Sequence, residues 1–168
     1  PFSYTQVLPD DFPVDYLIFS SGAGVLDLST KELLYATEIS EKQVQLIVNE
    51  LMRHKVDFMV HEPIPSNHRF LYYRSGNNNP DFEQRLAIYQ PFCQPFAPGV
   101  SYGSSAAQII AILPHDVEWF EKLRHCFPML KVILPIIMKF MKKPERGLIL
   151  TKNLLKPTGF NFKQHHGV

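Results

Sequence analysis

The residues best suited to chemistry in this 168-residue chain follow its first apolar run. The segment Tyr16-Leu17-Ile18-Phe19 is wholly apolar, and Ser20-Ser21-Gly22-Ala23-Gly24 comes directly after it. In an open α/β sheet, ligands bind where such strands end, and free backbone amides there can hold a phosphate. The glycine spacing matches neither a P-loop nor a dinucleotide fingerprint. Two interpretations stay open: a ligand-binding turn at Ser20, Ser21 and Gly22, and a tight turn that needs small residues for steric reasons.

The histidines and cysteines show no spacing typical of a metal site. No two histidines have the i, i+4 spacing of a helical metal site, and Cys93 and Cys126 do not form a CxxC pair. His54 ends an expected helix, where its charge would favour the negative end of the helix dipole. We therefore predict no metal ligands in this chain, capping or surface roles for the histidines, and free thiols in a reducing cytoplasm.

Charged side chains elsewhere indicate surface roles. Asp10-Asp11 lies in a proline-bordered loop, which favours solvated charge over paired acid–base chemistry. Arg69 and Arg74 flank the aromatic run Phe70-Leu71-Tyr72-Tyr73, a pattern that can stack single-stranded nucleic acid. We expect instead a half-buried strand with a charged rim, whose exposed face could close over a small anionic substrate.

The charge is divided unevenly along the chain. Residues 1–134 hold 10 Lys and Arg against 15 Asp and Glu, a net charge of −5, which argues against nucleic-acid binding by this part. Residues 135–168 hold 7 Lys and Arg and a single acidic residue, a net charge of +6. The C-terminal segment is therefore either a basic interaction arm or a piece outside the main fold. No apolar run is long enough to cross a membrane, and no signal-peptide pattern opens the chain.

Three helices are expected from their start signals and apolar spacing. Ser40 and Gln43 form a capping-box pattern ahead of a helix over residues 41–54. Asn79 and Pro80 are a good N-cap and first residue for a helix over residues 80–89. A third helix is expected over residues 115–127, with its apolar positions on one side.

Short apolar or alternating runs between these helices predict strands. They fall at 16–19, 25–28, 32–37, 56–61, 69–74, 106–113 and 130–134. The mixed order predicts an α/β fold in which helices cover an open mixed sheet, all three of them on one side. After residue 134 no sustained period is found, and most of that segment is expected to be coil.

The same run of residues resembles a known family. Asp15-Tyr16-Leu17-Ile18-Phe19-Ser20-Ser21-Gly22-Ala23-Gly24-Val25-Leu26-Asp27 resembles the passage from core strand to cap in Cof-type haloacid dehalogenase (HAD-like) hydrolases. Glu32-Leu33-Leu34-Tyr35 with the helix that follows it, then Pro114-His115-Asp116-Val117 and Leu130-Lys131-Val132-Ile133, resemble later elements of that cap. The resemblance covers residues 13–133 and implies the inserted α/β cap of a doubly wound enzyme.

The resemblance also implies what this chain would lack. Family members are mostly magnesium-dependent phosphatases that act on small phosphorylated metabolites. Their Asp-x-Asp-x-Thr nucleophile motif would precede Pro1, and their Gly-Asp-x-x-Asn-Asp metal motif does not occur in the chain. We therefore expect no catalytic residue and no cofactor in this chain, with magnesium implied for the full-length enzyme. Ser20, Ser21 and Gly22 would lie nearest to substrate, and Ser21 stands where many members have Asn.

These expectations divide the chain into three parts. Residues 1–19 would be a lead-in and a core-type strand, 20–134 an α/β cap domain, and 135–168 a basic tail. The expected function is the cap, or substrate-specificity region, of a HAD-like phosphohydrolase that is not catalytically competent alone. The alternative is a non-enzymatic binding module that engages a protein or nucleic acid through the basic tail. A stand-alone hydrolase built on His61 and Glu62 rests on their adjacency only.

Overall fold

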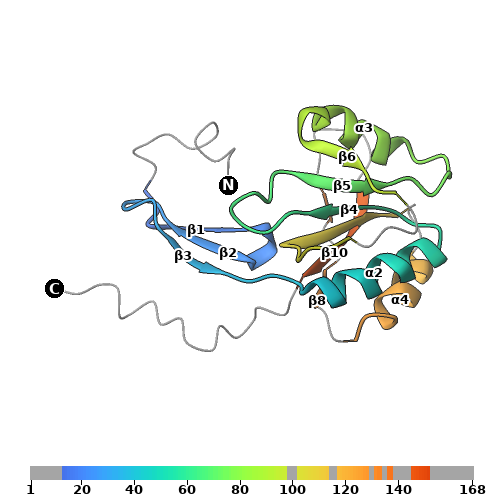
Figure 1. The fold of residues 1–168 in the computed structure, drawn as a ribbon, viewed down its shortest axis with the longest axis horizontal. Helices are drawn as coiled ribbons and strands as arrows, with labels where there is room; N and C mark the ends of the chain where they lie inside the picture. The colour runs from blue at the N-terminus through green and yellow to red at the C-terminus, as the bar shows by residue number, and fades with distance from the viewer. Residues whose placement is uncertain are drawn as a thin grey trace.

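The chain forms two β-sheets, one small and one large. A computed structural model describes residues 13–97, 102–113, 117–128, 131–133, 136–137 and 145–151. The small sheet extends to one side of the larger, helix-covered sheet (Figure 1). Its strands are β1 (Tyr16–Phe19), β2 (Gly24–Asp27) and β3 (Leu33–Ala36). The expected mixed α/β fold with an open sheet is confirmed.

The larger sheet has the strand order β6-β5-β4-β7-β10-β8. Its strands are β4 (Asp57–His61), β5 (Phe70–Tyr73), β6 (Cys93–Pro95), β7 (Gln108–Ile112), β8 (Lys131–Ile133) and β10 (Glu145–Thr151), and β9 (Ile136–Ile137) pairs with β10. The β5–β6 pair is parallel, whereas the other pairs are antiparallel. The helices are α2 (Glu41–Arg53), α3 (Pro80–Ile88) and α4 (Val117–His125), with short 3-10 turns η1 (Ser20–Gly22) and η2 (Gln90–Phe92). None of the described helices has the length and apolar character needed to cross a membrane.

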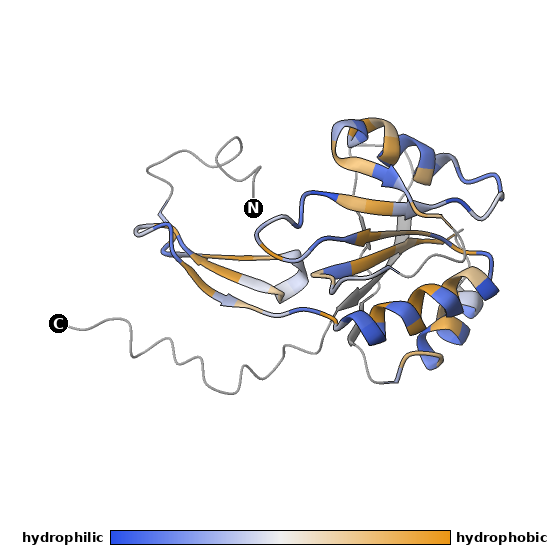
Figure 2. Cartoon of the chain, viewed as in Figure 1, coloured by the Kyte–Doolittle hydropathy of each residue, from blue (hydrophilic) through white to orange (hydrophobic). Residues whose placement is uncertain are grey.

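Helix α2 begins where the sequence pattern predicts. The Ser40 amide donates to Oε1 of Gln43 at 3.2 Å as part of the predicted capping box. Val44, Val48 and Leu51 are buried beneath the helix, so its apolar stripe faces the sheet. Figure 2 shows hydrophobic and hydrophilic residues alternating along α2, while the central strands are hydrophobic.

The helices cover both faces of the larger sheet, so the prediction that all three lie on one side is wrong. Phe58 and Val60 of β4 pack in the cluster that contains α2 and α4. Met59, which points the other way, packs against Phe82 and Leu86 of α3. Because successive strand residues point to opposite faces, β4 and β7 carry apolar side chains on both sides and need cover on both.

The C-terminal segment contributes a strand that the sequence did not reveal. β10 lies between β7 and β8 and pairs antiparallel with both, for example Ile149 with Ile110 and with Ile133. Residues 145–151 therefore belong to the main fold, and the expectation of coil there is wrong.

The first strand is less buried than its apolar sequence predicts. β1 pairs only with β2 among the described strands, and Ile18 is 60% exposed. The neighbouring apolar residues Val14 and Leu33 are 41% and 43% exposed. The small sheet thus presents apolar side chains to solvent.

Candidate functional site

The Ser20–Gly22 turn has an unusual backbone. Ser20, Ser21 and Gly22 have φ of 49°, 55° and 93°, and Ala23 closes the turn by donating its amide to the Ser20 carbonyl at 3.0 Å. A left-handed conformation costs a residue other than glycine about 1–2 kcal/mol. Two such serines in succession store strain, a property that clusters at functional sites.

Close packing explains the glycine that follows the turn. A Cβ atom built on Gly24 would lie 2.3 Å from Cζ of Phe19 across the β1–β2 pair. The steric interpretation of the small residues therefore holds for Gly24. It does not account for the two left-handed serines, whose positive φ values favour glycine.

Asn67 joins this turn to the larger sheet. Its amide Nδ2 donates to Oγ of Ser20 at 2.7 Å, across 47 residues of sequence. Its backbone carbonyl lies 2.9 Å from Nδ1 of His61, the last residue of β4. The loop between β4 and β5 thus connects Ser20 to the face of the sheet that α3 covers.

A pocket of about 280 Å³ opens on that face. Its polar lining consists of His61, Asn67, His68, Arg85 and Gln108. Its apolar lining consists of Met59, Phe70, Tyr89, Phe92 and Ile110. A concave site with apolar walls and a few convergent polar groups is the usual form of a small-molecule site, and this volume lies just below the range of about 300–1,000 Å³ that is usual for such sites.

The polar atoms of this pocket include two unused acceptors. A carbonyl can only accept, so Nδ1 of His61 donates to Asn67, and Nε2 of the neutral ring keeps its lone pair. Neither Nε2 of His61 nor Oδ1 of Asn67 has a hydrogen-bond partner in the described part of the chain, although both atoms are buried. An unsatisfied buried polar atom costs about 1–3 kcal/mol. A bound hydroxyl would recover part of that cost.

Burial keeps His61 neutral. Burial lowers the pKa of His61, the hydrogen bond to the Asn67 carbonyl raises it, and the Arg85 charge lowers it, and together they bring it to about 4. The ring is therefore uncharged at neutral pH. The pocket combines two buried acceptors with the guanidinium of Arg85 and suits a ligand that brings hydroxyl donors and negative charge.

Other residues singled out in the sequence lie apart from this pocket. Arg74 forms a two-point ion pair with Glu83, Nε to Oε1 at 2.7 Å and Nη2 to Oε2 at 2.9 Å, and its guanidinium lies over the Tyr72 ring. That pairing lowers the pKa of Glu83, and it leaves Arg74 paired at the end of the largely half-buried strand β5. His115, Asp10-Asp11 and His165-His166 lie outside the described residues.

The sequence did reveal the turn but not its partners. Asn67 sits in a proline-bordered loop with no motif around it, and Arg85 looks like an ordinary solvent-facing helix residue. The sequence did carry one signal for His61. It ends the apolar run Phe58-Met59-Val60, and because alternate strand residues share a face, this polar side chain lies on the same side of the sheet as Met59.

The magnesium implied by the resemblance does not fit these residues. In the described ranges, one group of three or more side chains could hold a metal ion, and it combines Glu50 with His54 and Cys126. Mg²⁺ prefers carboxylate oxygens and water in octahedral geometry, so a thiol and an imidazole suit it poorly.

The fold of this chain is similar to part of the fold of several HAD-like hydrolases. The chain is similar to a HAD subclass IIB sugar phosphatase, with a TM-score of 0.56 and 14% identity over 84% of this chain and 48% of the other. It is similar to a HAD phosphatase from Bacteroides thetaiotaomicron, with a TM-score of 0.57 and 12% identity over 85% of this chain and 48% of the other. For a haloacid dehalogenase-like hydrolase from B. subtilis the TM-score is 0.51, with 13% identity over 82% of this chain and 53% of the other.

These likenesses confirm the resemblance at the level of the fold. The chain spans about half the length of the solved structures it matches. No family model and no curated protein sequence matches the chain.

Proposed function

We propose that this chain is the cap, or substrate-specificity region, of a HAD-like phosphohydrolase that acts on small phosphorylated metabolites. The fold supports this, since the similar structures include a sugar phosphatase and a second HAD phosphatase, each about twice as long as the matched part. In such an enzyme the cap would close over the reaction site, exclude water and position the organic part of the substrate.

The observation that carries this proposal is the hydrogen bond from Asn67 to Ser20. It places the strained turn beside the β4–β5 loop, and Asn67 also lines the pocket. A ligand whose phosphate lies at Ser20, Ser21 and Gly22 could extend its hydroxyl groups toward His61. The turn would face the phosphate, and the pocket would select the leaving group.

The exposed apolar side chains of the small sheet support a larger parent protein. Val14, Ile18 and Leu33 are each more than 40% exposed, although apolar residues on a sheet usually pack against another layer. A catalytic core that continues this sheet would bury them. In that arrangement the core would supply the nucleophile and the magnesium ligands.

The cysteines bear on the compartment in which the protein works. Cys93 and Cys126 are both free thiols, which favours a reducing compartment such as the cytoplasm.

Two assays test the proposal together. The purified 168-residue chain should not hydrolyse p-nitrophenyl phosphate or hexose phosphates with magnesium present, whereas a known HAD-like phosphatase assayed in parallel should. The coding sequence upstream of residue 1 should encode Asp-x-Asp-x-Thr, and the longer product should show magnesium-dependent turnover. Rapid turnover by the short chain, or an upstream frame without that motif, would contradict the proposal.

The structure limits which residues can be removed to test the alternative, a binding module that uses the basic tail. β10, which includes Arg146, is part of the larger sheet, so removing residues 135–168 would also remove strands β9 and β10. A fair test removes only residues 152–168. A salt-sensitive gel shift that disappears with that truncation would favour this alternative over the cap.

A further inference from the structure

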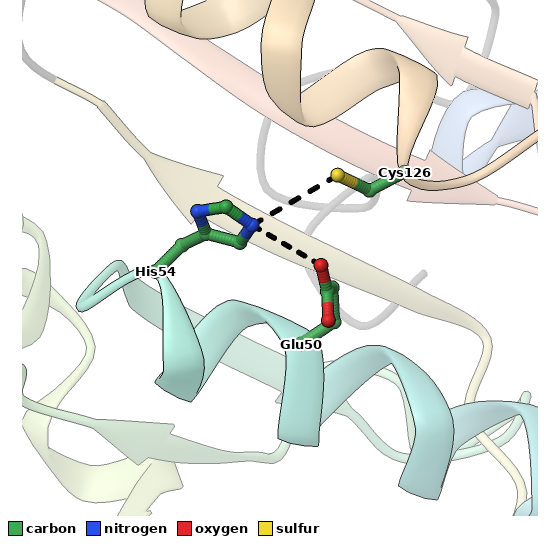
Figure 3. Close-up of side chains that lie close together, drawn as sticks. All are labelled: Glu50, His54 and Cys126. Carbon is green, nitrogen blue, oxygen red and sulfur yellow. Dashed lines mark hydrogen bonds and ion pairs between the residues drawn. The ribbon is translucent and has the colours of Figure 1, made fainter.

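A second cluster of reactive side chains lies on the opposite face of the sheet, away from the pocket. Glu50 and His54 stand one turn apart at the end of α2, and Cys126 follows the last residue of α4. Figure 3 shows the three side chains pointing toward one another, with a dashed line from His54 to each of the other two. Nε2 of His54 lies 3.1 Å from Oε1 of Glu50 and 3.9 Å from Sγ of Cys126.

We propose that Glu50, His54 and Cys126 form a binding site for Zn²⁺, with the fourth position of the ion open. The three donor atoms all lie within 4.8 Å of one another. Around a tetrahedral zinc with bonds of about 2.0–2.3 Å, neighbouring ligand atoms are roughly 3.3–3.6 Å apart. The distances of 3.1 Å and 3.9 Å lie on either side of this range, so small side-chain movements would admit the ion.

The donor set selects the kind of ion. Ca²⁺ and Mg²⁺ prefer a shell made of oxygen ligands, so a thiol and an imidazole beside one carboxylate suit them poorly. A thiolate with an imidazole and a carboxylate suits zinc, and three protein ligands with an open position form its ordinary reactive arrangement. The i, i+4 spacing of Glu50 and His54 places both on one face of α2 without distortion.

Arg53 contacts the same acceptor atoms of Glu50 and His54 that an ion would use. Its guanidinium contacts the Glu50 carboxylate, and its Nη2 lies 3.0 Å from Nε2 of His54. In the tautomer that accepts this contact, the Nε2 lone pair points into the cluster, as a metal requires. The Arg53 side chain is 66% exposed, and exposed ion pairs are weak, so an ion could displace the guanidinium at little cost.

The open position would face a groove between α2 and α4. This groove of about 390 Å³ is lined by Leu46, Ile47 and Phe127 as well as Glu50 and Cys126. A bound ion would join the C-terminal ends of the two helices and leave a coordination site for a small ligand. The site is independent of the cap assignment, since it lies across the sheet from His61.

Cobalt titration of the purified chain tests the site, because Co²⁺ takes the same geometry and a bound thiolate gives it a near-ultraviolet charge-transfer band. The band should appear in the wild type and in Cys93→Ser, which makes the same chemical change at the other cysteine. It should be absent in Cys126→Ser, and zinc should displace the cobalt. Zinc affinity should fall at least about 100-fold in that variant, since even loss of a group that only orients a ligand costs 10–100-fold.

His54→Gln provides a second variant in which the thiol remains. It should weaken zinc binding by a similar factor while its far-ultraviolet circular dichroism stays unchanged, so it decides the matter where Cys126→Ser does not fold. No thiolate band in the wild type, a band that persists in folded Cys126→Ser, or unchanged zinc affinity in His54→Gln would each overturn the proposal.

Discussion

His61 should make the stability of the larger sheet depend on pH. Its pKa is about 4 in the folded protein, against 6.5 for a histidine in water. Between these values the unfolded chain binds a proton that the folded chain does not, so the free energy of unfolding rises with pH. The stability that the neutral His61 ring gives the folded protein is complete above pH 6.5, and it is lost as the pH falls through 6.5 toward 4.

The magnitude follows from the pKa difference. Each pKa unit corresponds to 1.36 kcal/mol, so the full change in the free energy of unfolding is about 3 kcal/mol. About 2 kcal/mol of this change falls between pH 7 and pH 5. These values are an upper end, because Nε2 is fully buried while the imidazole as a whole is only partly buried. The carboxylates with lowered pKa values, Asp27, Glu50 and Glu83, have ordinary pKa values of 3.8 to 4.5 and titrate mainly below this window.

Urea unfolding at pH 7 and pH 5 measures the effect. Wild type should lose about 2 kcal/mol on acidification, and His61→Gln should lose much less, because no group at this position then binds a proton. His125→Gln is the matched control, since His125 is exposed at the end of α4 and its loss should leave the wild-type pH dependence unchanged. Equal pH dependence in wild type and His61→Gln would refute the reasoning.

Two further substitutions test the local structure. Asn79→Ala should lower the free energy of unfolding by about 2 kcal/mol, because the Asn79 side chain accepts from the Phe82 amide at the start of α3 and also donates to Asp57 at 2.8 Å. The urea midpoint measures this loss, and a loss under about 0.5 kcal/mol would contradict the prediction. Gly24→Ala should lower the free energy of unfolding by about 1–3 kcal/mol, because the new Cβ would meet the Phe19 ring. In a Phe19→Ala background the same substitution should have almost no effect, and an unchanged loss there would exclude the Phe19 contact as the cause.

Local signals in the sequence predicted the elements well. The capping box at Ser40 and the N-cap at Asn79 are both confirmed, because each depends on residues within three positions of one another. The placement of α3 was wrong although a signal existed. The run Ile109-Ile110-Ala111-Ile112 is apolar at every position, and a strand buried on both faces needs helices on both.

Contacts between distant segments could not be predicted from spacing. Asn67 meets Ser20 across 47 residues, and Cys126 meets His54 across 72. No local pattern records either pair, because the packing of elements that are distant in sequence decides them. β10 was missed for a similar reason. Its partner β7 lies more than 30 residues earlier in the chain, and Pro135 and Pro144 lie between β10 and its other partner, β8.

The division of the chain at residues 19 and 134 stays a prediction. So does the role of Ser20, Ser21 and Gly22 in holding a phosphate. The second of these depends on where a phosphorylated ligand binds, which chemical-shift changes along the chain would reveal directly.

The most direct test of the cap assignment is therefore a backbone amide NMR titration of the ¹⁵N-labelled chain with a hexose phosphate, with inorganic phosphate alone as the comparison. We predict that the hexose phosphate shifts the amides of Ser20, His61, Asn67 and Arg85. Inorganic phosphate should shift Ser20 and Ser21 but leave His61 and Arg85 unchanged. Shifts confined to other parts of the chain, or none at all at millimolar ligand, would contradict the account.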